Sequence, residues 1–231
     1  MLRERLKSIL RGPRSPYEAG PPPPDSGQPR FVPRSSKREM VHTRPSRGLE
    51  QFFASFRDQA GLTILDLGGA YQENINFITS LGHKFYSEDF LRIFQDTFAA
   101  DPADQSNPGR IEFFVRQSLD YPEEHFDGVL AWDALEYMAP PLLSATVDRL
   151  LRILKPKGYL LAFFHSADRL ETVPCYTFRI QDLHALQVGE HGTRTPPQLF
   201  NNRSLEKVFQ RFESVKFFLT REHLREVIVR K

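Results

Sequence analysis

The chain has 231 residues, of which 40% are hydrophobic, and it carries a formal net charge of +2. This length and apolar content suit one α/β domain with an appendage, and no apolar run is long enough to span a membrane. The single cysteine, Cys175, excludes an internal disulfide, the scattered histidines exclude a metal site of recognisable spacing, and the lack of a visible secretory signal leads us to expect a cytoplasmic protein.

The first 46 residues differ in composition from the rest of the chain. They hold nine of the eighteen prolines, and the eleven basic and four acidic residues of 1–47 give +7, which against the total of +2 leaves −5 for residues 48–231. Because so few apolar residues cannot offset the entropy lost on ordering, we predict a basic, Pro-rich disordered tail over 1–46 and a folded domain over 47–231. The mildly acidic domain lacks the basic field expected of a nucleic-acid-binding protein.

Residues 2–11 form a possible exception within this tail. Leu2, Leu6, Ile9 and Leu10 fall on one helical face among basic residues. Such a helix could make a weak contact with a membrane surface or a partner protein. A frayed, solvated segment is the alternative at this length.

The folded part is predicted to open with a helix and then a strand–turn–helix–strand unit. The expected elements are a helix over 49–58, a strand over 62–67, a helix over 73–81 and a strand over 84–87. Gly68 and Gly69 follow the first strand and let the backbone turn sharply or approach a ligand closely. The second strand brings Glu88 and Asp89 to the same edge of the sheet, where an acid can accept hydrogen bonds from both hydroxyls of a ribose.

The glycine turn does not have the pattern of a dinucleotide site. The run from Gly68 to Glu73 lacks the later glycines of G-x-G-x-x-G, and it puts the anion Glu73 where a phosphate would lie. The turn therefore favours a cofactor that has a ribose but no phosphate.

Helices and strands continue to alternate after this unit. The expected elements are a helix over 90–99, a polar loop over 101–109, a strand over 110–116, a strand over 128–132, a helix over 143–154 and a strand over 159–164. Such alternation predicts a mainly parallel sheet that is covered on both faces.

The alternation breaks at Ser166–Phe200, which has no helical period. We predict a β-excursion there, with strands over 176–180 and 185–188, and a helix after the capping residues Asn201 and Asn202. The excursion leaves the edge of the sheet at which ligands bind, and it is far longer than an ordinary connection. We therefore expect it to cover the crevice and to face the substrate.

The last two strands, 215–219 and 224–229, are predicted to be antiparallel, because their link is too short for a parallel crossover. Together with the glycine turn, FDGVLAWDALEY at 126–137 and LRILKPKGY at 151–159, this hairpin makes residues 47–231 resemble the class I S-adenosylmethionine-dependent methyltransferases. The resemblance implies a doubly wound, Rossmann-like α/β fold. Its sheet would be seven-stranded and mainly parallel, with an antiparallel C-terminal hairpin and a β-excursion after strand five.

The resemblance also implies which residues bind the cofactor. They are Asp66, Gly68, Gly69, Glu88, Asp89, Phe90, Gln117, Ser118 and Trp132. The glycine turn would line the methionine part, and Asp89, or else its neighbour Glu88, would accept from the ribose hydroxyls. Phe90 would lie against the adenine, and Gln117, at the end of strand three, could accept from the adenine amino group.

Two residues at strand ends are candidates for the chemistry itself. Asp133 follows the fourth strand, nearest the transferred methyl group in such folds, and could orient the substrate or act as a base. Its alternative role is to cap the helical segment after it. His165 ends the fifth strand and could be a general base, or else a structural histidine.

The resulting prediction is an S-adenosylmethionine-dependent methyltransferase that acts on a small molecule, without a metal and without a nucleic-acid partner. One alternative is a non-catalytic scaffold or regulator, since Ala70 and Gln72 stand where the family usually has its second and third glycines. The other alternative is a nucleic-acid methyltransferase guided by the basic tail.

Overall fold

The computed structural model describes residues 40–99, 101–166, 172–220 and 224–231, all within one compact unit that spans Lys37–Lys231. In chain order the elements are β1 (Met40–Pro45), α1 (Arg47–Ala54), β2 (Thr63–Asp66), α2 (Gln72–Ser80), β3 (Lys84–Ser87), α3 (Phe90–Phe98), the 3₁₀ turn η1 (Pro102–Ser106), α4 (Pro108–Ser118), β4 (Phe126–Trp132), η2 (Ala134–Tyr137), α5 (Pro140–Ile153), β5 (Leu154–His165), β6 (Val173–Ile180), β7 (Ala185–Arg194), α6 (Asn202–Val208), β8 (Ser214–Leu219) and β9 (Leu224–Arg230). In the described part of the chain, no helix is both long and apolar enough to cross a membrane.

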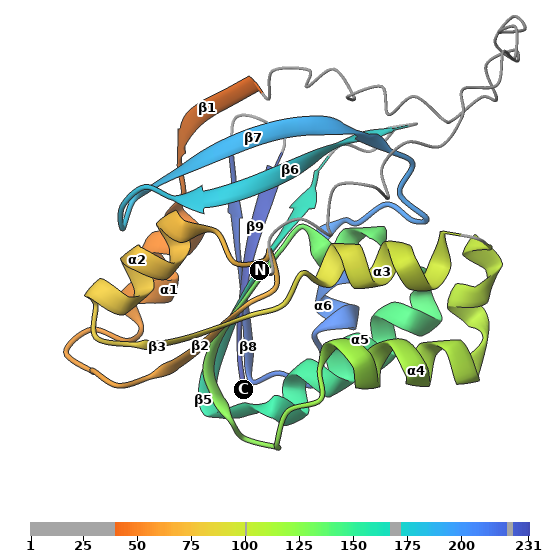
Figure 1. Cartoon of the computed structure of the whole chain (residues 1–231), viewed down its shortest axis with the longest axis horizontal. Helices are drawn as coiled ribbons and strands as arrows, with labels where there is room; N and C mark the ends of the chain where they lie inside the picture. Colours follow the sequence, from red (N-terminus) through yellow and green to blue (C-terminus); the bar gives the residue numbers. More distant parts are fainter. Residues whose placement is uncertain (1–39, 100, 167–171, 221–223) are drawn as a thin grey trace, which may run out of the picture. The chain divides into compact units, whose positions relative to one another are not determined.

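The main sheet has the strand order β3-β2-β4-β5-β9-β8. Its first four strands are parallel, β9 runs antiparallel to β5, and β8 runs antiparallel to β9. This confirms the predicted mainly parallel sheet with an antiparallel C-terminal hairpin. A second sheet, in the order β1-β7-β6, lies across the top of the main sheet in Figure 1.

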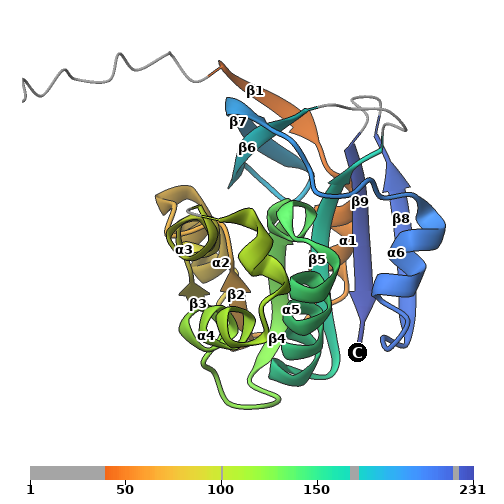
Figure 2. The same ribbon diagram turned by 90° about the vertical axis from the view of Figure 1, so that its right-hand side faces the viewer.

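Alternate residues of the central strands supply two separate hydrophobic clusters. On β5, Leu160, Ala162 and Phe164 belong to the cluster with α3, α4, α5 and α6, whereas Leu161 and Phe163 belong to the cluster with α1, α2 and the second sheet. Strand side chains point to opposite faces in turn, so one buried strand serves both clusters. Figure 1 shows α1 and α2 on one side of the sheet and α3, α4 and α5 on the other, and Figure 2 views the sheet from the face that α4 and α5 cover.

The segment predicted as the third strand, Arg110–Arg116, is helical and lies within α4. The Asn107 side chain caps this helix by accepting from the backbone N–H groups of Gly109 (3.0 Å) and Arg110 (3.3 Å), and Pro108 suits its first position. The short apolar run inside it is compatible with either structure. The main sheet of the described residues therefore has six strands instead of seven.

Residues 40–46, predicted to belong to the disordered tail, are part of the fold. β1 pairs antiparallel with β7 from Met40 opposite Glu190 to Pro45 opposite Ala185. The predicted boundary at residue 46 is therefore too late in the chain. The rest of the predicted tail, 1–39, and its candidate helix over 2–11 lie outside the described residues.

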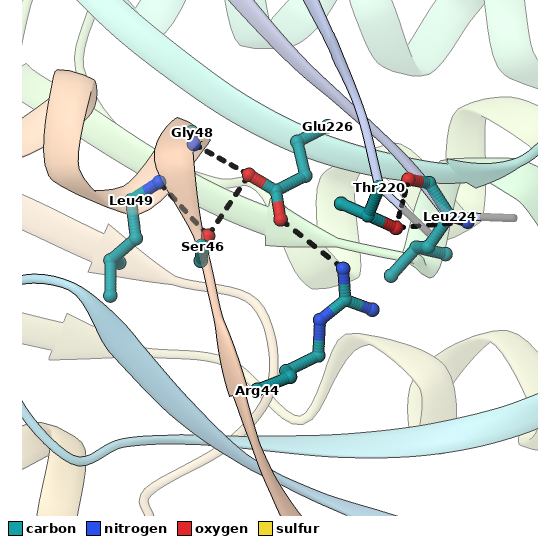
Figure 3. A network of polar contacts seen from close by, with 7 residues as sticks. All are labelled: Arg44, Ser46, Gly48, Leu49, Thr220, Leu224 and Glu226. Atoms are coloured by element: carbon teal, nitrogen blue, oxygen red, sulfur yellow. Dashed lines mark hydrogen bonds and ion pairs between the residues drawn. The ribbon is translucent and has the colours of Figure 1, made fainter. Parts of the chain in front are cut away.

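A buried carboxylate joins the second sheet to the main sheet (Figure 3). Glu226 on β9 is fully buried, and it accepts from Arg44 Nη2 (3.3 Å), from Ser46 Oγ (3.1 Å) and from the backbone N–H of Gly48 (2.5 Å). A Cβ atom on residue 48 would lie only 2.8 Å from Glu226 Oε2, so this close approach needs glycine. The end of β1 and the start of α1 are thus both held on β9.

Candidate cofactor and acceptor site

A cavity of about 190 Å³ lies where the parallel strands end and β6 and β7 pass over them. Its wall comes from the turn after β2, the start of α3, the end of β4 and the inner side of β6 and β7. Among the residues that line it are Gly68, Tyr71, Asp89, Trp132, Asp133, Cys175, Tyr176, Phe178 and Arg194. The predicted β-excursion therefore does cover the carboxyl edge of the sheet.

The two glycines of the turn have different surroundings. Gly69 has a φ of +96°, and a Cβ atom added there would meet nothing within 4 Å. At Gly68 an added Cβ atom would lie 2.9 Å from the indole of Trp132. Gly69 thus presents an open backbone, and Gly68 allows the indole to approach the turn closely.

Asp66 supports this turn from behind and does not line the cavity. Its buried carboxylate accepts from Trp132 Nε1 (2.5 Å), from the N–H of Gly68 (2.8 Å) and from Asn74 Nδ2 (2.8 Å). Burial raises the pKa of Asp66 to about 6, although the three donors act in the opposite direction. Asp66 therefore fixes the turn and the indole, whereas the resemblance implied that it would contact the cofactor.

The hydrogen bonds around Asp66 continue through Asn74 into β6, which passes over the cavity. Asn74, fully buried on α2, also donates to the carbonyl of Phe178 (3.2 Å) and accepts from the N–H of Ile180 (2.7 Å). The indole of Trp132 stacks on the Phe178 ring, with centroids 5.3 Å apart and planes 8° apart. The glycine turn and β6 are thus directly connected. Sequence reasoning missed Asn74, whose only signal is an amide in the first turn of a helix.

Of the two acids after β3, only Asp89 faces the cavity. Its carboxylate is 55% exposed and pairs with Arg92 Nε at 3.3 Å, and it caps α3 by accepting from the N–H of Arg92. Glu88 instead accepts a hydrogen bond from the Tyr121 hydroxyl and does not line the cavity. The geometry therefore favours Asp89 over Glu88 as a ribose acceptor.

Phe90, Gln117 and Ser118 do not line the cavity. The Phe90 ring is fully buried and packs edge-to-face on Phe114, with centroids 5.0 Å apart. Gln117 and Ser118 end helix α4 instead of a strand, and the Ser118 hydroxyl donates to the Phe114 carbonyl (2.8 Å). The predicted adenine contact of Gln117 depended on a strand that is absent at 110–116, and the burial of Phe90 keeps its ring out of the cavity.

Asp133 lies in the cavity wall and is only 2% exposed. The Tyr137 hydroxyl donates to its Oδ2 at 2.6 Å, and its side chain makes no capping bond to the 3₁₀ turn after it. Burial raises the pKa of Asp133 to about 6, and the bond from Tyr137 opposes this rise. The carboxylate is therefore positioned to exchange a proton near neutral pH.

His165, the other catalytic candidate, lies behind the cavity wall. Its Nδ1 is 2.6 Å from Glu136 Oε2, and its backbone N–H donates to Glu136 Oε1 at 2.8 Å. Its ring stacks on Tyr176, with centroids 5.7 Å apart. Because Tyr176 lines the cavity and His165 does not, the histidine stands one side chain away from any bound molecule.

The residues around the cavity fit S-adenosylmethionine. Gly68 lines the cavity, its neighbour Gly69 has an open backbone that a ligand can approach, and the exposed carboxylate of Asp89 reaches the cavity from the end of β3. In the described part of the chain, no three His, Cys, Asp or Glu side chains are grouped closely enough to hold a metal ion.

Several known proteins are similar to this chain. Solved structures similar to the chain include 1,6-didemethyltoxoflavin-N1-methyltransferase of Burkholderia thailandensis, with 14% identity over 80% of this chain and 76% of that one and a TM-score of 0.44. Another is a SAM-dependent methyltransferase of Archaeoglobus fulgidus, with 13% identity over 79% of this chain and 91% of that one and a TM-score of 0.46. No curated protein matches the sequence. Residues 38–213 match the family described as "Methyltransferase domain", so the chain belongs to this family and is an S-adenosylmethionine-dependent methyltransferase.

Proposed function

We propose that this methyltransferase acts on a small molecule, which it binds in the cavity under β6 and β7. The observation that carries the proposal is that one cavity is lined both by Gly68 and Asp89, on the cofactor side, and by the buried carboxylate of Asp133. Aromatic rings and a few polar side chains line the cavity, as is typical of small-molecule sites. The net charge of −5 over residues 48–231 gives no electrostatic support to a nucleic-acid substrate.

S-adenosylmethionine, when bound, supplies a methyl group on a sulfonium, which is a good leaving group. The task of the protein is therefore to align the acceptor, exclude water and remove a proton. The backbone of the Gly68–Gly69 turn would hold the methionine part, and Asp89 would accept hydrogen bonds from the ribose hydroxyls. The β6–β7 hairpin would keep water from the reacting atoms.

Asp133 would act as the proton acceptor. S-adenosylmethionine would supply the methyl group to an oxygen or nitrogen of the acceptor, leaving S-adenosylhomocysteine, and the Asp133 carboxylate would take the proton that this atom loses. A pKa of about 6 leaves this carboxylate ionised at neutral pH yet basic enough to take a proton. The hydroxyl of Tyr137 holds it in place.

Calorimetry with S-adenosylhomocysteine tests the cofactor part of the proposal. Wild-type protein should bind this product, and Asp89→Ala should weaken binding by about 10-fold or more, because a charge-assisted pair of hydrogen bonds is lost. Glu88→Ala is the matched control and should leave the affinity within about 2-fold, because its carboxylate is bonded to Tyr121 and lies outside the cavity. Equal effects of the two substitutions would refute the assignment of Asp89, and failure of the wild type to bind would refute the proposed function.

A further inference from the structure

Arg194, at the end of β7, is a cation of the cavity wall whose charge has no partner among the described residues. Its guanidinium lies over the Tyr137 ring, with Cζ 5.1 Å from the centroid, and it forms no ion pair with a described carboxylate. Arg92, the other arginine in the wall, is already paired with Asp89. A partly buried guanidinium that packs on a ring and pairs with no described carboxylate retains donors for a planar anion.

The nearby carboxylate of Asp133 does not neutralise Arg194. The interactions that shift the pKa of Asp133 are its burial, the bonds from Tyr137 and Tyr176, and the charges of Glu136 and His165. Asp133 and Arg194 are instead bridged by one side chain, because the hydroxyl of Tyr137 bonds to Asp133 and its ring carries the guanidinium. A bound anion and the proton acceptor would therefore lie within one tyrosine side chain of each other.

We propose that Arg194 binds a carboxylate of the methyl acceptor, and that the acceptor is a planar carboxylate bearing a hydroxyl or amino group. The inference rests on the proposed function, since Asp133 would take the proton of that second group. The aromatic side chains in the wall, those of Tyr71, Trp132, Tyr176 and Phe178, would favour a planar acceptor. Arginine pairs with a carboxylate through two parallel hydrogen bonds, which would fix the orientation of the acceptor toward Asp133.

A carboxylate at Arg194 could come from two sources, the acceptor or the methionine part of the cofactor. The two sources predict different results for Arg194→Gln, which removes the charge and keeps a polar side chain. If the acceptor supplies the carboxylate, this variant keeps its affinity for S-adenosylhomocysteine and loses affinity for a separate anion. If the cofactor supplies it, the affinity for S-adenosylhomocysteine falls.

Benzoate and benzamide are a matched pair of probes, with the same shape and a different charge. Each is titrated into the full chain in the presence and absence of saturating S-adenosylhomocysteine, and binding is followed by the fluorescence of Trp132, the only tryptophan of the chain and a residue of the cavity wall. Benzoate should bind about 10-fold more tightly than benzamide to the wild type. Arg194→Gln should abolish this preference, and Arg194→Lys should keep part of it.

Arg92→Gln is the control, and it should keep the preference because its guanidinium is already matched by Asp89. Equal binding of the two probes to the wild type, or no binding of either, would overturn the inference. So would an Arg194→Gln variant that weakens S-adenosylhomocysteine as strongly as benzoate. If the wild type binds benzoate with this preference but not S-adenosylhomocysteine, the proposed function fails and the anion site stands. Circular dichroism and the melting temperature show whether each variant is folded.

Discussion

The cavity has a floor, formed by the glycine turn after β2 and the end of β4, and a cover, formed by β1, β7 and β6. Buried polar groups stabilise these two regions in different ways. In the floor, the Asp66 carboxylate receives three hydrogen bonds from its own chain. The cover, made of β1, β7 and β6, is held at one place by Asn74 and at another by Glu226. Between floor and cover, the Arg194 guanidinium faces the cavity without a described carboxylate partner. Asp66, Asn74 and Glu226 are thus bonded within the protein, whereas the proposed role of Arg194 is to bind a ligand.

The largest expected effect comes from removing the first strand of the cover. A chain that begins at residue 46 lacks β1 and leaves the buried Glu226 without Arg44. An unpaired buried charge costs about 3–5 kcal/mol, and the lost strand pairing adds to this, so the melting temperature should fall by roughly 10–20 °C.

A chain that begins at Met40 is the control for this truncation, because it keeps β1 and Arg44. Its melting temperature should match that of the full chain, since the composition of residues 1–39 offers little apolar surface for a core. Equal melting temperatures for the two truncated chains would show that β1 does not stabilise the domain.

The next largest effect should come from Asn74→Ala, which removes the hydrogen bonds that connect the cover to the floor. The substitution leaves the N–H of Ile180 and the carbonyl of Phe178 without this partner, and it removes one donor from Asp66. Unsatisfied buried groups of this kind cost about 1–3 kcal/mol each, so we expect a loss of about 4 kcal/mol in urea unfolding.

Asn76→Ala, on the exposed side of the same helix, is the matched control. Its side chain bonds only to Gln72 at the surface, and its loss should cost about 0.5 kcal/mol or less. Hydrogen exchange should also show faster exchange of the Ile180 amide in Asn74→Ala and not in Asn76→Ala. Similar losses of stability in the two variants would mean that floor and cover are not connected through Asn74.

The smallest effect concerns the pH dependence of stability in the floor. Because the folded-state pKa of Asp66 is raised from 3.8 to about 6, the folded protein binds more protons than the unfolded chain between these values. Its contribution to stability is therefore present at low pH and is lost as the pH rises toward 6. The stability of the wild type relative to Asp66→Asn should fall by about 2 kcal/mol from pH 4 to pH 6 and stay constant above that. The lowered pKa of His83 acts in the opposite direction but cancels in this comparison. A relative stability that rises with pH would mean that the three donors outweigh burial.

Most of the main sheet could be predicted from the sequence because its signals are local. The apolar run before Gly68, the period of the helix that follows it and the cap at Asn201 each lie within a few residues. The prediction of a strand at 110–116 is wrong because seven residues fit either period, and the decisive signal was the cap at Asn107. The strand β1 was not predicted, because its partner β7 lies far along the chain and local composition does not reveal the pairing.

The candidate site could be predicted only as a set of strand ends. The glycine turn, Asp89 and Asp133 are predicted because each follows a strand, and Gly68, Asp89 and Asp133 line one cavity. The sequence favours Asp89 over its neighbour Glu88 as the ribose acceptor, and only Asp89 lines the cavity, since Glu88 is bonded to Tyr121. Neither Asn74 nor Arg194 was assigned a role, because their partners lie on distant elements.

Methyl transfer from labelled S-adenosylmethionine into a cell extract tests the central claim most directly. When the extract is incubated with the wild type, label should appear in its small-molecule fraction. The rate of methyl transfer should rise as the pH increases through about 6, because Asp133 loses its proton there. Asp133→Asn should lower this rate by about 100-fold or more, because a positioned proton acceptor typically contributes 10²–10⁴-fold, while its affinity for S-adenosylhomocysteine is retained. Label that appears only in protein or nucleic acid, or an Asp133→Asn variant as fast as the wild type, would contradict the account.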